Sequence, residues 1–336
     1  MRQGWSLCSE AGNVTPGNAP TVSKQPPVRI GSRASPLAQA QARQVQAAIT
    51  AVLGAPPDEA DTVAPITFFS TAGDRIQDRR LLEIGGKGLF TEEIEAALRV
   101  NEIDCAVHSL KDVPSALPEG LIIAATPERE DARDAFVSLT CARFEDLPEG
   151  AKLGTASLRR QTQALFRRPD LELVNLRGNV QTRIAKLERG EADGILLAYA
   201  GLRRLGLEGV ARQLFDPDEI PTAPGQGCLA IETRIEDAGC LWAKALNHEP
   251  TALAIAAERG ALEALEGSCR TAVAARAVLE DGGLRLIVEA LTPDGKERFR
   301  REARLDAVTR QSADALGRRL GDEIRAEGGD RLLLKT

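Results

Sequence analysis

Short apolar runs alternate with segments of helical periodicity through the first two thirds of the chain. A short apolar run bounded by turn residues is typical of a buried strand. The predicted strands cover residues 28–32, 66–69, 103–107, 121–125, 151–155, 171–176 and 195–198. Helices are predicted between them, after residues 35 and 157 and at 89–100 and 180–187. Strands that alternate with helices predict parallel sheets that are covered on both faces.

The two halves of this region begin in the same way. Gly31-Ser32 closes the first strand, and Ser35 with Pro36 carries the signals of a helix start. In the second half, Gly154-Thr155 closes a strand and Ser157 opens a helix. We interpret this pattern as two α/β lobes of similar plan that face a cleft, where ligands bind beyond the carboxyl ends of the strands.

The last third of the chain has a different pattern. A helix is predicted at 251–265, strands at 272–279, 284–290 and 297–303, and an amphipathic helix at 308–326. Gly-containing turns separate the strands, as in hairpins, so this part is predicted to be a small α+β domain. The predicted organisation is a disordered tail (1–26), a first lobe (27–128 plus 226–246), a second lobe (133–222) and a third domain (250–336).

Composition and charge narrow the classes of function. The chain has 336 residues, 43% of them hydrophobic and 27% charged, with a net charge of −6. This charge argues against non-specific binding to nucleic acid or anionic membranes, and no apolar run approaches the roughly 18 residues of a membrane span. The tail lacks the apolar core of a secretory signal, so a cytoplasmic location is expected. Six scattered cysteines without a CxxC pair and only two histidines argue against a metal site.

Arginines follow several of the predicted strands, which is where a ligand of such sheets binds. They are Arg33, Arg159, Arg160, Arg177, Arg183 and Arg204. Guanidinium groups and the helix starts at Ser35 and Ser157 both suit carboxylates or phosphates. The set therefore predicts one cleft that binds a polyanion, although each arginine taken alone could equally be a solvated surface residue.

The segment "IDCAVHSLKDVP" places a cation and a carboxylate at the exit of a predicted strand. If the extended conformation persists, Ser109 and Lys111 share one side and Asp112 points to the other. A carboxylate there could accept a hydrogen bond from a ligand N–H and stabilise a developing cation. The alternative is a surface Lys–Asp pair that contributes little.

Two further segments carry candidate chemistry. "GGKGLFTEEIE" lacks the spacing of a phosphate-binding loop, so it is either a flexible connection into a helix or a mobile lid that carries Lys87 and Phe90. In "LEGSCRTAVA", Cys269 stands beside Arg270, which would favour its thiolate. A lone cysteine is also compatible with a structural role.

Ten segments, in order along the chain, together resemble the porphobilinogen deaminase (hydroxymethylbilane synthase) family. They are "GSRASPLA", "GGKGLF", "AVHSLKDVP", "EREDARDAF", "GTASLRRQ", "LRGNVQTR", "LAYAGLRRLG", "APGQG", "LNH" and "LEGSC". The resemblance implies head-to-tail condensation of four porphobilinogen molecules, with loss of ammonia at each addition, to give the linear tetrapyrrole 1-hydroxymethylbilane. Each pyrrole carries two carboxylate arms, so the growing chain is a polyanion of the kind that the arginines suggest.

The resemblance also implies roles for individual residues. Cys269 would hold a dipyrromethane cofactor through a thioether, and Asp112 would be the catalytic carboxylate. The other implied cofactor-binding residues are Ser109, Lys111, Thr155, Ser157, Arg159, Arg160 and Arg183. Those implied for the substrate or the growing chain are Arg33, Ser35, Gln41, Arg177, Arg204 and Gln226, with Lys87 and Phe90 on a mobile loop. The family further implies two lobes of the periplasmic-binding-protein plan and a monomer.

The sequence departs from the family pattern at two places, and two other functions remain open alternatives. Ala156 replaces a hydroxyl residue, which removes one possible carboxylate donor, and Ala272-Val273 replaces the usual Pro-Ile-type pair. A binding protein of the periplasmic type would share the two lobes, but it needs an export signal and leaves Cys269 unexplained. A nucleotide-dependent transferase would need a phosphate loop of different spacing.

Overall fold

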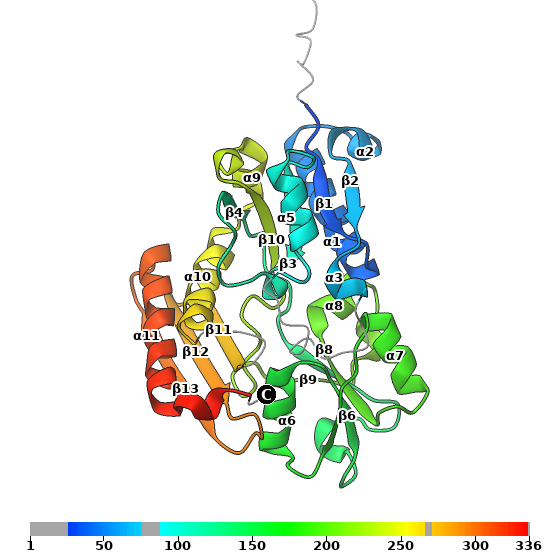
Figure 1. Cartoon of the computed structure of the whole chain (residues 1–336), viewed down its shortest axis with the longest axis vertical. Coiled ribbons are helices and arrows are strands. Elements are labelled where there is room, and N and C mark those ends of the chain that lie inside the picture. Colours follow the sequence, from blue (N-terminus) through cyan, green and yellow to red (C-terminus); the bar gives the residue numbers. More distant parts are fainter. Residues whose placement is uncertain (1–25, 76–87, 266–270, 335–336) are drawn as a thin grey trace, which may run out of the picture.

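The computed structural model describes residues 26–75, 88–265 and 271–334 of the chain. Three sheets organise these residues, two of five strands and one of three. In Figure 1 the first sheet lies at the top, the second at the lower right and the third at the lower left. This arrangement is the predicted fold class, two α/β lobes followed by a smaller α+β domain.

The first sheet has the strand order β2-β1-β3-β10-β4. Its strands are β1 (Ile30–Arg33), β2 (Ile66–Phe69), β3 (Cys105–Ser109), β4 (Leu121–Ala125) and β10 (Leu229–Arg234). β1 is parallel to β2 and β3, whereas β10 is antiparallel to both β3 and β4. The prediction of purely parallel sheets is therefore wrong, because the chain returns from the second lobe and runs through this sheet in the opposite direction.

Helices cover the two faces of the first sheet. They include α1 (Pro36–Val52), α2 (Ala60–Val63), α3 (Ala72–Arg75), α5 (Glu92–Arg99) and α9 (Leu241–Leu246). α1 begins where the sequence predicts, since the Ser35 side chain accepts a hydrogen bond from the Ala38 amide and Pro36 holds the first helical position. One core joins α1 and α9 to the strands, and a second joins Ile94 and Leu98 of α5 to the other face.

The second sheet repeats this mixed topology in the order β7-β6-β8-β5-β9. Its strands are β5 (Asp134–Val137), β6 (Lys152–Gly154), β7 (Glu172–Val174), β8 (Gly194–Ala198) and β9 (Gln213–Leu214). Its helices include α6 (Leu158–Arg167), α7 (Val180–Glu188) and α8 (Tyr199–Arg204). β6 is parallel to β7 and β8, while β5 is antiparallel to β8 and β9. The carboxyl ends of β6, β7 and β8 thus lead into α6, α7 and α8.

The third sheet is an antiparallel meander of β11 (Ala272–Glu280), β12 (Gly283–Leu291) and β13 (Arg298–Leu305). α10 (Glu249–Ala264) and α11 (Arg310–Gly328) cover one face and share a core with it. The two helices approach closely, since a Cβ added at Gly317 would lie 2.0 Å from the Ala257 carbonyl oxygen. Two strands of this sheet, β11 and β12, also contact α6 of the second lobe (Figure 1).

A buried carboxylate on α10 ties the three parts of the molecule together. Glu258 is fully buried and accepts hydrogen bonds from Arg129, at 2.5 and 3.2 Å. Its oxygens also accept from the Gly225 amide at 2.7 Å and from the Ala277 amide of β11 at 2.9 Å. Arg129 and Gly225 lie on the two connections between the lobes, so α10 fixes both connections to the third sheet.

None of the helices in the described ranges combines the length and the apolar character that crossing a membrane requires.

Candidate anion-binding site

The exit of β3 turns sharply into the site. Ser109 ends the strand, and Leu110–Asp112 form a 3-10 turn rather than an extended segment. The expectation that Lys111 and Asp112 point to opposite sides of an extended strand is therefore wrong. Both residues instead lie within electrostatic reach of Arg160 in the second lobe. Ser109 is held by the Gln41 side chain, whose Nε2 donates to the Ser109 Oγ at 2.8 Å.

Lys111 has an environment that disfavours its charge. Its surface is exposed, yet enough protein lies around its ammonium group to hinder hydration of the charge. This enclosure, reinforced by the positive charges of Arg160 and Arg159, lowers the pKa of Lys111 to about 8. Asp112 and Asp134 oppose the shift without cancelling it.

Arg33, the last residue of β1, extends the site toward α5. Its guanidinium forms an ion pair with Asp74, and its Nη1 lies 3.9 Å from the Asp112 Oδ2. The same group stacks over the Phe90 ring, 4.2 Å from the ring centroid. Lys87, the other residue expected on this loop, lies outside the described residues. The first strand therefore brings a cation next to the predicted catalytic carboxylate.

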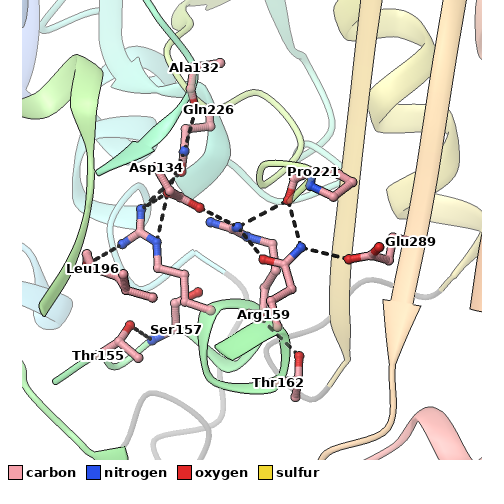
Figure 2. A network of polar contacts seen from close by, with 12 residues as sticks. Ala132, Asp134, Thr155, Ser157, Arg159, Thr162, Leu196, Pro221, Gln226 and Glu289 are labelled. Atoms are coloured by element: carbon pink, nitrogen blue, oxygen red, sulfur yellow. Dashed lines mark hydrogen bonds and ion pairs between the residues drawn. The ribbon is translucent and has the colours of Figure 1, made fainter. Parts of the chain in front are cut away.

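Asp134, the first residue of β5, organises the second lobe's part of the site (Figure 2). It is buried and accepts hydrogen bonds from the Arg159 Nη1 at 2.6 Å and from the Arg160 Nε and Nη2 at 3.0 and 2.6 Å. Burial alone would raise the pKa of this carboxyl, but the two guanidinium charges hold it well below its usual range. Asp134 is not among the predicted site residues, although it stands where the charged run 128–134 meets an apolar strand.

Arg159 and Arg160 each have a further N–H donor that does not bind Asp134. The Arg160 Nη1 donates to the Leu196 carbonyl at 3.0 Å. The Arg159 Nε is buried and has no hydrogen-bond partner among the described residues. A buried guanidinium N–H without an acceptor is costly, so this donor is an indication of an absent anionic partner.

Arg177 and Arg183 bring further positive charge to the same cluster. Arg177 is buried, and the Arg183 Nε donates to the Gly178 carbonyl at 2.8 Å. Burial lowers the pKa of Arg183 to about 10, and the charges of Arg160 and Arg177 act in the same direction while Asp112 opposes them. At the start of α6, the Ser157 amide donates to the Thr155 Oγ1 at 3.2 Å, and the Ser157 hydroxyl makes no capping hydrogen bond.

Other predicted site residues lie apart from this cluster or have structural partners. Arg204 donates to the Gly227 carbonyl at 2.8 Å, and its buried Nε has no partner in the described part of the chain. Gln226 is 1% exposed and donates to the Ala132 carbonyl at 2.6 Å and to Asp134 at 2.9 Å. Ser35 caps α1. Cys269 lies outside the described residues.

The balance of charge determines what this site can do. Among the described residues, and apart from the Arg33–Asp74 pair, five cations lie near two carboxylates. The cations are Lys111, Arg159, Arg160, Arg177 and Arg183, and the carboxylates are Asp112 and Asp134. A ligand with several carboxylates would relieve this excess of positive charge. Within the described ranges, no group of three or more His, Cys, Asp or Glu side chains could hold a metal ion.

Two solved structures with a similar chain path were found among binding proteins. One is an ABC-transporter periplasmic substrate-binding protein of Coxiella burnetii, with TM-score 0.40, 15% identity, 65% coverage of this chain and 89% of that chain. The other is a nutrient-binding protein of Burkholderia cenocepacia bound to methionine, with TM-score 0.39, 16% identity, 65% coverage of this chain and 89% of that chain.

Sequence relatives are far more similar. Residues 28–241 match the family model described as porphobilinogen deaminase, dipyromethane cofactor binding domain, and residues 252–326 match the model of its C-terminal domain. A porphobilinogen deaminase of Caulobacter vibrioides is 61% identical over 323 residues, which are 93% of this chain and 99% of the relative. One of Phenylobacterium zucineum is 61% identical over 317 residues, 92% of this chain and 99% of the relative. The chain therefore belongs to the porphobilinogen deaminase family.

Proposed function

We propose that this chain is the transferase hydroxymethylbilane synthase. It would condense four porphobilinogen molecules head to tail, release ammonia at each addition and yield 1-hydroxymethylbilane. The observation that carries the proposal is the excess of cations over carboxylates between the two lobes, with the pKa of Lys111 and of Arg183 lowered to about 8 and about 10. A growing oligopyrrole with two carboxylate arms on each ring would supply the missing negative charge.

The residues of the cluster fit a dipyrromethane cofactor attached to Cys269. Its carboxylates would accept hydrogen bonds from the unpartnered Arg159 Nε and from Lys111 and Arg183. The other residues assigned to it are Ser109, Asp112, Thr155, Ser157 and Arg160. When bound, this group supplies the pyrrole carbon at which chain growth begins.

Asp112 is assigned the catalytic role. Loss of ammonia from porphobilinogen leaves a positive charge spread over the pyrrole ring. A carboxylate at the turn after β3 would accept a hydrogen bond from the pyrrole N–H and stabilise this charge. Arg33, 3.9 Å from Asp112, would at the same time bind a carboxylate arm of the substrate.

The remaining assignments concern the substrate and the growing chain. Besides Arg33, they are Ser35, Gln41, Arg177, Arg204 and Gln226, with Lys87 and Phe90 on a loop over the site. Gln41 would act through the Ser109 hydroxyl that it holds, and Gln226 through Asp134 and Arg160, because its amide is buried among them. Arg204 offers a direct donor, its unpartnered Nε.

The test is the intact mass of the full chain before and after incubation with porphobilinogen. We expect the wild type to carry the mass of two linked pyrrole units and to gain further pyrrole units with substrate. Cys269→Ser should gain none, whereas Cys141→Ser, which removes another free thiol, should match the wild type. Asp112→Asn should keep the two-pyrrole mass but lose turnover. A wild type that stays at the bare chain mass throughout would contradict the proposal.

We further propose that the protein acts as a monomer in the cytoplasm. The buried free thiols of Cys105 and Cys228 support a reducing compartment, and burial raises the pKa of Cys228 to about 12. Sedimentation of the loaded protein should give the mass of one chain.

A further inference from the structure

Gln163 on α6 connects Arg159 to the third domain. Its Oε1 accepts a hydrogen bond from the Arg159 Nη1 at 2.9 Å. Its Nε2 donates to the Pro221 carbonyl at 2.9 Å and to the Glu289 Oε1 at 2.9 Å. Because each end of the amide has its own kind of partner, the side chain is fixed in the orientation that presents oxygen to Arg159.

Glu289 comes from β12, so this anchor belongs to a different domain from the one that carries Arg159. It is 2% exposed, and its second oxygen faces Arg300 and Arg298 at 3.7 and 4.0 Å. Both arginines line a cavity of about 460 Å³ between the second lobe and the third sheet, together with Gln163. One oxygen of the carboxylate therefore accepts a hydrogen bond from Gln163, while the other lies within ion-pair range of the third domain's cations but accepts no hydrogen bond among the described residues.

Arg159 needs this support because Asp134 is shared. Asp134 accepts hydrogen bonds from Arg160 through one oxygen and from Arg159 through the other. Arg160 gains a further acceptor in the Leu196 carbonyl. The corresponding acceptors of Arg159 are Gln163 and, at 3.3 Å, the Pro221 carbonyl. All of these partners bind Nη1, which leaves the Nε without a partner among the described residues.

We propose that Glu289 is a positioning residue, which acts through Gln163 to hold Arg159 with its Nε directed at a ligand carboxylate. This inference rests on the proposed function and deepens it by assigning the third domain a part in forming the cofactor site. Glu289 touches neither the cofactor nor the substrate in this arrangement. Replacing Glu289 should therefore no longer slow cofactor loading once Arg159 has been replaced by a residue without a planar fork of N–H donors.

The experiment follows loading of the full chain, produced without a supply of porphobilinogen, by intact mass after porphobilinogen is added. The variants are Gln163→Leu, Glu289→Leu and Glu289→Gln, each also combined with Arg159→Lys. Glu302→Gln is the matched control, because this carboxylate lies on the neighbouring strand β13, is half exposed and pairs with Arg285 rather than accepting a hydrogen bond from Gln163. Thermal unfolding of each variant separates loss of stability from loss of loading.

We expect two-pyrrole loading to slow about tenfold in Gln163→Leu and about fivefold in Glu289→Leu, since hydrogen bonds that hold a charged group are lost. Glu289→Gln keeps an acceptor for Gln163 and should load within about twofold of the wild type. In the Arg159→Lys background, the effect of Glu289→Leu should vanish, whereas a merely structural role would leave it additive.

Three further outcomes would overturn the assignment. If Gln163→Leu and Glu289→Leu load as fast as a normally loading wild type, the positioning role is excluded. The proposed function would remain intact. Equal losses in Glu289→Gln and Glu289→Leu would exclude the hydrogen bond as the cause. A wild type and a Glu302→Gln control that acquire no pyrrole mass would overturn the proposed function, and the positioning role with it.

Discussion

Asp134 and Lys111 bring opposite charges to the same cluster, and their partners differ sharply. Asp134 accepts hydrogen bonds from Arg159, Arg160 and Gln226. Lys111 has charged neighbours but no hydrogen-bonding partner among the described residues. The first has its partners inside the folded chain, whereas the second is an exposed cation whose charged neighbours include two arginines. A negatively charged ligand would offset the repulsion between Lys111 and these arginines.

The pH dependence of unfolding in a Lys111 variant tests whether the surroundings of Lys111 disfavour its charge. Its pKa is about 8 in the folded chain and 10.5 for an ordinary lysine, so between these values the unfolded chain binds more protons. The wild type should therefore gain stability as the pH rises through this window. Lys111→Met should be more stable than the wild type at pH 7 and lose that advantage by about pH 10. Urea unfolding at both pH values measures this.

The control for that measurement is Lys152→Met, which removes an exposed lysine from β6. A stability difference between Lys111→Met and the wild type that is the same at both pH values would show that the enclosure of Lys111 carries no penalty.

The cations of the site could be predicted from the sequence, but Asp134, the acid that binds Arg159 and Arg160, could not. Arginines after strand ends are visible as a pattern, because a ligand of an α/β sheet binds at that edge. Asp134 stands in a run of alternating charges, where nothing local separates a buried acceptor from a solvated one. Likewise, the turn at Leu110–Asp112 contacts partners that are distant in sequence, since the Leu110 amide donates to the Cys228 carbonyl and Asp112 lies near Arg160.

At the scale of elements, apolar runs located seven strands of the two lobes but missed β5, β9 and β10, and they did not give the strand directions. β2 and β4 have the predicted bounds, since both are short runs with clear turn signals. β5 and β10 run antiparallel to their neighbours, and their direction depends on where the chain crosses between lobes. Hydrophobic periodicity contains no information on that crossing, so the mixed topology had to come from the structure.

α10 is the element on which both crossings depend, and Glu258 is its critical residue. Glu258→Gln would leave the enclosed Arg129 guanidinium without its counter-charge and weaken the contacts to the Gly225 and Ala277 amides. Breaking a buried ion pair by removing one partner costs about 3 kcal/mol or more. We expect a loss of that size in the free energy of unfolding, measured with urea.

The matched control is Glu263→Gln on the same helix, where the carboxylate is half exposed and pairs with Arg318. Its loss should be below about 1 kcal/mol, as for other surface pairs. Equal effects of the two substitutions would contradict the view that α10 joins the lobes through one buried charge.

The whole molecule combines a negative net charge with a positive site. The chain carries 43 Lys and Arg against 49 Asp and Glu, a net charge of −6. Many acids pair with arginines at the surface, as Glu263 does with Arg318 and Glu323 with Arg319. In the site, Arg159 and Arg160 instead share one carboxylate, Asp134. A substrate therefore meets a local potential whose sign is opposite to that of the molecule as a whole.

This contrast predicts the sign of the salt dependence. Porphobilinogen carries two carboxylates and one ammonium, so it is a net anion. If the site's own potential guides it, kcat/KM should fall several-fold as NaCl rises from about 20 to about 500 mM, because salt screens the attraction. If the net charge governed the encounter, kcat/KM would rise instead.

Two variants test whether the site itself causes this dependence. Arg183→Gln should reduce the slope of kcat/KM against salt concentration, since it removes one cation of the site, whereas Arg319→Gln on exposed α11 should leave that slope unchanged. A slope that is the same in all three proteins would place the attraction outside the cluster.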